Sequence, residues 1–142
     1  MVFQGKTIMH ISNIDHIVLT TKDIRQCLSF YGELLGMEVL RENGRYALRF
    51  GDAKINIHRF SGEFQPAAER PSAGSLDFCL ITEDPIEAVY QELKNKKAPF
   101  VTDIVERKGA LRPMRSFYLR DPDGNLVEIA GYTEKKEYNG ND

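Results

Sequence analysis

Apolar and polar side chains alternate along two similar stretches of the chain, one around His16 and one around Asp77. Alternation with a period of two is typical of a strand that buries one face. Each stretch ends in a Thr, a charged residue and an Asp, and the two stretches lie 61 residues apart. This repeat predicts two copies of one structural unit.

An amphipathic helix is expected after each of these strands. Asp23 and Asp84 can cap the two helices, because an Asp carboxylate accepts hydrogen bonds from the unpaired N–H groups of a first turn. Pro85 suits a first helical position, where a missing N–H costs nothing, and Gly36 is expected to end the first helix. Apolar residues recur between these signals at helical spacing: Ile24, Cys27, Leu28, Tyr31 and Leu35, then Ile86, Val89, Tyr90 and Leu93.

Three strands are expected after each helix, separated by turns rich in Gly, Asn and Asp. They fall at residues 38–41, 45–50 and 54–60, and again at 100–105, 114–120 and 126–132. The pattern therefore predicts an α+β chain of two tandem βαβββ modules. We expect an extension at 1–13, a single domain at 14–132 (module one 14–60, linker 61–74, module two 75–132) and a loose tail at 133–142.

Four metal-capable side chains stand opposite the apolar face of the expected strands. His16 and Asp77 belong to the first strand of each module, and His58 and Glu128 to the last. Aligning the ends of the two modules at an offset of 70 residues pairs His58 with Glu128. Two imidazoles and two carboxylates suit Zn, Ni, Co, Mn or Fe(II), and a cation would offset the cost of a carboxylate inside an apolar strand. For each residue alone, a hydrogen-bonded position in the core or rim stays the competing interpretation.

Composition narrows the class of protein. The chain has 142 residues and a formal net charge of −2, and its scattered Lys and Arg argue against a broad nucleic-acid surface. No apolar run approaches the roughly 20 residues of a membrane span, and no apolar signal segment precedes residue 10. Cys27 and Cys79 lie in apolar segments and are expected to be buried, reduced thiols. We therefore expect a cytoplasmic protein with no nucleic-acid or membrane partner.

Several motifs resemble the vicinal oxygen chelate superfamily of glyoxalases, bleomycin-resistance proteins and extradiol dioxygenases. They are IDHIVL at 14–19, FY at 30–31 before LLGMEV at 34–39, and DPDGNLVE at 121–128. Residues 47–58 and 74–82 are similar to the glyoxalase-domain-containing protein 5 type, which includes bacterial proteins labelled virulence-associated.

The resemblance implies a cupped, barrel-like mixed sheet with helices outside, around one divalent metal per site. It matches His16 and Glu128 to family ligands, whereas His58 and Asp77 stand where Glu and His are common. It also implies a homodimer that shares modules between subunits.

Three functions follow, in this order of preference. The first is a metal-dependent, glyoxalase-like lyase or isomerase that chelates two oxygens of a small oxygenated or thiol-adduct metabolite, with Glu128 as the catalytic proton carrier. The second is an extradiol-type dioxygenase that holds Fe(II) with His16, His58 and Glu128. The third is a non-catalytic protein that sequesters a small molecule or an antibiotic.

Overall fold

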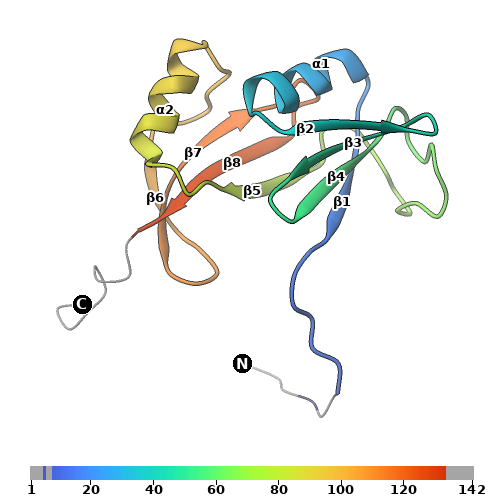
Figure 1. Cartoon of the computed structure of the whole chain (residues 1–142), viewed down its shortest axis with the longest axis horizontal. Coiled ribbons are helices and arrows are strands. Elements are labelled where there is room, and N and C mark those ends of the chain that lie inside the picture. Colours follow the sequence, from blue (N-terminus) through green and yellow to red (C-terminus); the bar gives the residue numbers. More distant parts are fainter. Residues whose placement is uncertain (1–4, 6–7, 134–142) are drawn as a thin grey trace.

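The computed structural model describes residue 5 and residues 8–133, and it confirms the expected repeat of strand, helix and three strands (Figure 1). Two four-stranded mixed sheets form the fold, and they are cupped rather than closed. Both helices lie on the same side of the sheets in Figure 1. The expected loose tail lies outside the described residues, apart from Thr133.

Module one forms a sheet in the order β1-β4-β3-β2, with β1 parallel to β4. Its elements are β1 (His16–Thr20), α1 (Ile24–Leu28), the π-helical turn η1 (Ser29–Leu34), β2 (Glu38–Glu42), β3 (Arg45–Phe50) and β4 (Ala53–His58). Asn43 and Gly44 both have positive φ, 52° and 73°. This is the geometry of a type I′ hairpin turn, and it sets the pairing of β2 with β3.

Module two repeats this arrangement in the order β5-β8-β7-β6, with β5 parallel to β8. Its elements are β5 (Asp77–Ile81), α2 (Ile86–Asn95), β6 (Val105–Lys108), β7 (Pro113–Arg120) and β8 (Leu126–Tyr132). Among the described residues, no helix is long and apolar enough to cross a membrane.

The two helices begin differently. Asp23 caps α1 as expected, since its carboxylate accepts the N–H of Gln26 at 3.1 Å. The prediction that Asp84 caps α2 is wrong, because Pro85 is the residue that precedes the first turn of α2. A residue before proline is biased away from helical angles, and the Asp84 carboxylate instead accepts from the Thr82 hydroxyl at 3.3 Å.

One strand of module two lies later in the chain than the pattern indicated. Most of the expected strand at 100–105 is reduced to an isolated bridge between Phe100 and Leu119, and β6 overlaps it at Val105 alone. The side-chain oxygen of Thr102 accepts the N–H of Tyr118 at 3.2 Å. A side chain thus takes the place of a backbone carbonyl, and the ladder does not continue there.

A single apolar core lies between the helices and the two sheets. Its fully buried members come from both modules: Leu19, Cys27, Tyr31, Leu48, Ile55, Phe117, Leu119 and Val127. Cys27 is buried as expected, whereas Cys79 is exposed, which corrects the expectation for that thiol; both cysteines are free. Because β5 alternates, Phe78 and Leu80 pack on the core and Cys79 points to the other face.

The turn between β7 and β8 joins the two modules. Asp121 is 4% exposed, and its carboxylate accepts the Tyr31 hydroxyl at 2.7 Å, the N–H groups of Asp123 and Asn125, and the Asn125 amide. Asp123 in turn accepts the Thr21 hydroxyl at 2.6 Å. The DPDGN motif is therefore a structural joint between module two and the first helix of module one.

The linker packs tightly on the same joint. The N–H of Leu76 donates to the Asn125 side chain at 2.8 Å. A Cβ on Gly74 would lie 2.4 Å from the Asp123 carbonyl oxygen, so only glycine fits there.

Burial, followed by the Asp121 and Asp123 carboxylates, raises the pKa of the Cys27 thiol to about 12, and burial beside Asp121 raises the pKa of Tyr31.

Candidate metal centre and ligand pocket

Each sheet has an open face, defined here as the face turned away from the core. In module one the open faces of β1 and β4 carry His16, Val18, Thr20, Lys54, Asn56 and His58. In module two the open faces of β5 and β8 carry Asp77, Cys79, Ile81, Leu126, Glu128, Ala130 and Tyr132. All four candidate ligands thus lie on open faces, as the alternation predicted.

The strand register separates the two histidines of module one. His16 lies opposite Lys54, and His58 lies opposite Thr20, at the far end of the same parallel pair. Four residues of strand rise and one strand spacing put the two Cα atoms roughly 14 Å apart. His16 and His58 of one chain therefore cannot bind the same ion.

The two carboxylates of module two are closer to each other. Asp77 lies opposite Leu126. Glu128 lies opposite Cys79, which is two residues further along β5 than Asp77. Two residues of rise and one strand spacing put the Cα atoms of Asp77 and Glu128 roughly 8 Å apart. Module two therefore offers both of its candidate ligands at neighbouring positions of one face.

The register also corrects the alignment of the two modules. Because His16 pairs with Lys54 and Asp77 pairs with Leu126, the last strands are related by an offset of 72 residues. The offset of 70 that paired His58 with Glu128 is wrong. The residue of module one equivalent to Glu128 is Asn56, which lies opposite Val18 and diagonal to His16.

The environment of Glu128 fits a bound cation. Its Oε2 atom is enclosed and has no hydrogen-bond partner among the described residues, and the same holds for the Ser116 hydroxyl on β7. A buried carboxylate oxygen without a partner is costly, and a metal ion is one group that relieves the cost. Partial burial and the neighbouring Glu128 carboxylate raise the pKa of the Cys79 thiol to about 12.

His16 is held in a defined orientation by its neighbour. Its Nδ1 lies 2.9 Å from the Asp15 carboxylate, which leaves Nε2 for another contact. A carboxylate on one imidazole nitrogen is a common support for a metal-ligating histidine. Both His16 and Asp77 are exposed, however, and within the described part of the chain no three His, Cys, Asp or Glu side chains lie close enough to hold an ion.

His58 lines a separate pocket of about 310 Å³ on the open face of module one. The residue is 6% exposed, and its Nδ1 is enclosed without a hydrogen-bond partner in the described ranges. Its ring meets the Phe64 ring edge to face at 5.3 Å. Phe64 belongs to the linker, which has no periodic signal, so the sequence pattern did not predict its part in the pocket.

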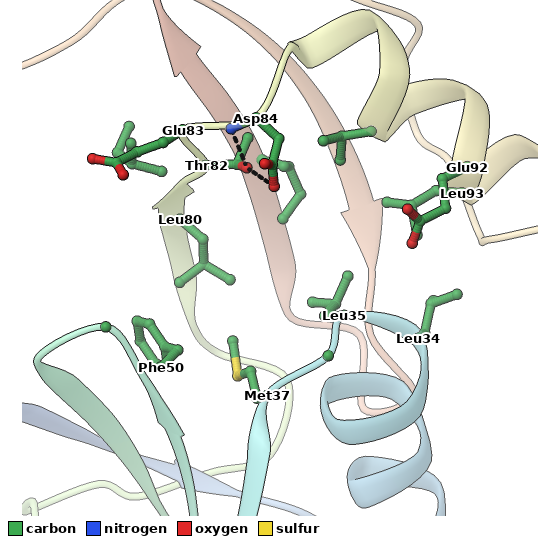
Figure 2. Close-up of a pocket in the computed structure, with 15 residues that line it drawn as sticks. Leu34, Leu35, Met37, Phe50, Leu80, Thr82, Glu83, Asp84, Glu92 and Leu93 are labelled. Atoms are coloured by element: carbon green, nitrogen blue, oxygen red, sulfur yellow. Dashed lines mark hydrogen bonds between the residues drawn. The ribbon is translucent and has the colours of Figure 1, made fainter.

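A second cavity, of about 660 Å³, lies where the two modules meet on the side of the helices (Figure 2). Leu34, Leu35, Met37 and Phe50 line it from module one, and Leu80 and Leu93 from module two. Its acidic residues are Glu83, Asp84 and Glu92. None of the four candidate ligands lines this cavity, so it is distinct from the open faces.

The fold and sequence of the chain agree with those of one protein superfamily. A model of the Glyoxalase/Bleomycin resistance protein/Dioxygenase superfamily matches residues 13–129, and the chain belongs to this superfamily. It is 46% identical over 125 residues to virulence protein STM3117 of Salmonella typhimurium, covering 87% of each chain. The crystal structure of that protein matches with a TM-score of 0.83 at 45% identity, over 88% of this chain and 100% of the other.

Two further relatives extend the comparison. The chain is 39% identical over 129 residues to glyoxalase domain-containing protein RDO1 of Mycosarcoma maydis, covering 90% of this chain and 73% of that protein. A lactoylglutathione lyase structure from Agrobacterium tumefaciens matches with a TM-score of 0.67 at 20% identity, over 92% and 98% of the two chains. At that identity the match shows the fold alone.

Proposed function

We propose that this chain is a metal-dependent lyase or isomerase of the glyoxalase type, acting as a homodimer on a small oxygenated or thiol-adduct metabolite. In this proposal His16 and Asn56 of one chain face Asp77 and Glu128 of a second copy across one divalent metal. The observation that carries the proposal is the enclosed Oε2 of Glu128, which has no hydrogen-bond partner within the described ranges and lies on an otherwise apolar strand.

The separation of the candidate ligands supports the dimer. Module one offers an imidazole and an amide, and module two offers two carboxylates, on open faces of different sheets. Neither pair holds an ion tightly by itself, because catalytic metal sites use at least three protein ligands. Two copies that bring unlike modules together would complete two equivalent sites, as closed twofold symmetry requires.

The side chains have distinct roles in this proposal. One imidazole, one amide and two carboxylates form a mixed nitrogen and oxygen set, which suits Mn, Co, Ni, Zn or Fe(II). When bound, such a metal would supply Lewis-acid polarisation of two adjacent substrate oxygens. Asp15 orients the His16 ring, and Glu128, the least exposed of the carboxylates, is the proposed proton carrier.

The dioxygenase alternative is disfavoured by the register. It needs His16, His58 and Glu128 around one Fe(II), whereas the two histidines are about four residues of strand apart in one chain. A sequestering protein remains the second candidate, favoured by the apolar walls of the His58 pocket. Turnover separates the two: a hemithioacetal or similar adduct is converted by an enzyme and only bound by a sequestering protein.

Metal content tests the proposal directly. Elemental analysis of protein purified without a His-tag or chelator should give about one divalent metal per chain. Glu128→Ala and His16→Ala should each remove it, while circular dichroism stays unchanged. His58→Ala is the matched control and should keep its metal. Undiminished metal in both ligand variants would overturn the assignment.

A further inference from the structure

We propose that the pocket beside His58 binds the carboxylate of a monoanionic ligand that has an apolar or aromatic body. The pocket lies on the open face of module one and includes Asn56. The inference rests on the proposed function, because it names the substrate class that the neighbouring metal centre would act on. Its basis is a pair of cations that make no ion pair among the described residues, beside a buried imidazole.

The Arg45 guanidinium is the first cation of the pocket. Its guanidinium lies over the Phe64 ring, 4.1 Å from the centroid, and it makes no ion pair within the described residues. On the same strand, by contrast, Arg49 pairs with Glu38 at 2.7 Å. Stacking on Phe64 fixes the plane of the Arg45 guanidinium and leaves its N–H groups for a ligand.

Lys54 is the second cation of the pocket. It is half-buried on β4 and also has no carboxylate partner in the part of the chain that the structure describes. The one acidic residue of the lining is Glu42, opposite Arg45 in the β2–β3 ladder. Arg45, Lys54 and Glu42 give the lining two positive charges and one negative charge, which matches a monoanion better than a dianion.

The remaining lining fits the body of such a ligand. Leu40, Ala47 and Phe64 supply apolar walls, and about 310 Å³ is near the small end of ligand pockets. His58 contributes an imidazole whose Nδ1 is enclosed and has no hydrogen-bond partner in the described part of the chain. Arg45 and His58 flank the paired residues Tyr46 and Ile57 and would hold the carboxylate, whereas Lys54, four residues away along β4, would add positive charge to the pocket.

Calorimetric titration with benzoate and with benzamide, its neutral isostere, tests the proposal. Benzoate should bind saturably and at least about 10-fold more tightly than benzamide. Equal affinity for the two, no binding of benzoate at millimolar concentration, or tighter binding of dianionic phenyl phosphate would each overturn the assignment. The titration is repeated on Glu128→Ala, which removes a proposed metal ligand and changes no residue that lines this pocket. Benzoate binding that persists there separates the pocket from the metal centre, and binding that is lost there overturns the pocket while the proposed function stands.

Variants of the two cations locate the site. Arg45→Gln should weaken benzoate binding about 10-fold, and Lys54→Gln should weaken it by a smaller factor. His58→Phe should also weaken benzoate binding while it keeps the ring contact with Phe64. Arg49→Gln is the matched control, since Arg49 lies on the same strand and face but is paired with Glu38. It should bind benzoate like the wild type. Wild-type affinity in Arg45→Gln, or an equal loss in Arg49→Gln, would overturn the proposal.

Discussion

The two modules share a fold but differ in the chemistry of their open faces. On the open face of the parallel pair β1 and β4 in module one, the polar residues are His16, Thr20, Lys54, Asn56 and His58, and no carboxylate is present. On the corresponding pair of module two, Asp77 and Glu128 are acidic, and no basic side chain is present. The core-facing residues of both strand pairs are apolar, whereas their open faces differ in charge.

Packing restricts the core-facing positions of the two modules more than their open-face positions. Core-facing positions such as Ile55 and Val127 are both fully buried and pack into one cluster. Open-face positions need only avoid a clash, so each module can specialise in one half of a shared site. Complementary faces also favour contact between unlike modules over contact between like ones.

Breaking the joint between the modules is the strongest test of the comparison. Asp121→Ala would leave the buried Tyr31 hydroxyl and the Asn125 amide without their acceptor. We expect the free energy of unfolding, measured by urea denaturation, to fall by about 3–4 kcal/mol. The control Asp103→Ala removes a carboxylate whose side chain is 81% exposed, and it should change stability by less than about 1 kcal/mol. Equal losses in the two variants would contradict a structural role for the DPDGN turn.

Giving module one the carboxylate of module two sharpens the comparison. Asn56→Glu places an acid at the position equivalent to Glu128. If the metal lies between the two faces, affinity for Mn or Zn should rise about 10-fold, because a carboxylate adds a charged ligand. Competition with a chelating dye measures it, and Asn56→Gln serves as the uncharged control. Unchanged affinity in Asn56→Glu would remove Asn56 from the proposed ligand set.

The two cysteines give the smallest contrast between the modules. The pKa of Cys27 is about 12 in the folded chain against an ordinary 9.0, so the folded state keeps a proton that the unfolded state loses. Rising pH therefore favours unfolding between these values. Between pH 8 and 10 the wild type should lose about 1 kcal/mol more stability than Cys27→Ala.

Cys79→Ala is the comparison variant for that measurement. The pKa of Cys79 is also raised to about 12, but the residue is exposed on the open face of β5. Because solvent screens an exposed group, its removal should change the pH dependence less than removal of Cys27. An equal or larger change in Cys79→Ala would mean that burial does not separate the two thiols.

Alternation in the sequence predicted most of the strands and all of the open-face assignments. The bounds of β3 and β8 agree with the expected 45–50 and 126–132. The expected strand at 100–105 was wrong because the Thr102 side chain replaces a ladder carbonyl there, which alternation does not register. The π-helical turn after α1 was also missed, since its apolar spacing continues that of an ordinary helix.

The misplaced histidine has a simple physical origin. Shifting a strand by two residues keeps every side chain on its face, so alternation cannot distinguish an offset of 70 from one of 72. Only the hydrogen-bonded pairing of His16 with Lys54 and of Asp77 with Leu126 fixes the register. Likewise, nothing in the aperiodic linker indicated that Phe64 would pack against His58 and Arg45.

The linker has a consequence for how relatives of this protein can diverge. At one end Phe64 forms a wall of the pocket, and at the other Gly74 touches the Asp123 carbonyl that anchors module two. The second end admits no side chain at Gly74, whereas the first end contacts the pocket through the Phe64 ring. Replacing residues 59–70 with those of a relative should therefore give this chain the ligand preference of that relative. No strand would be altered.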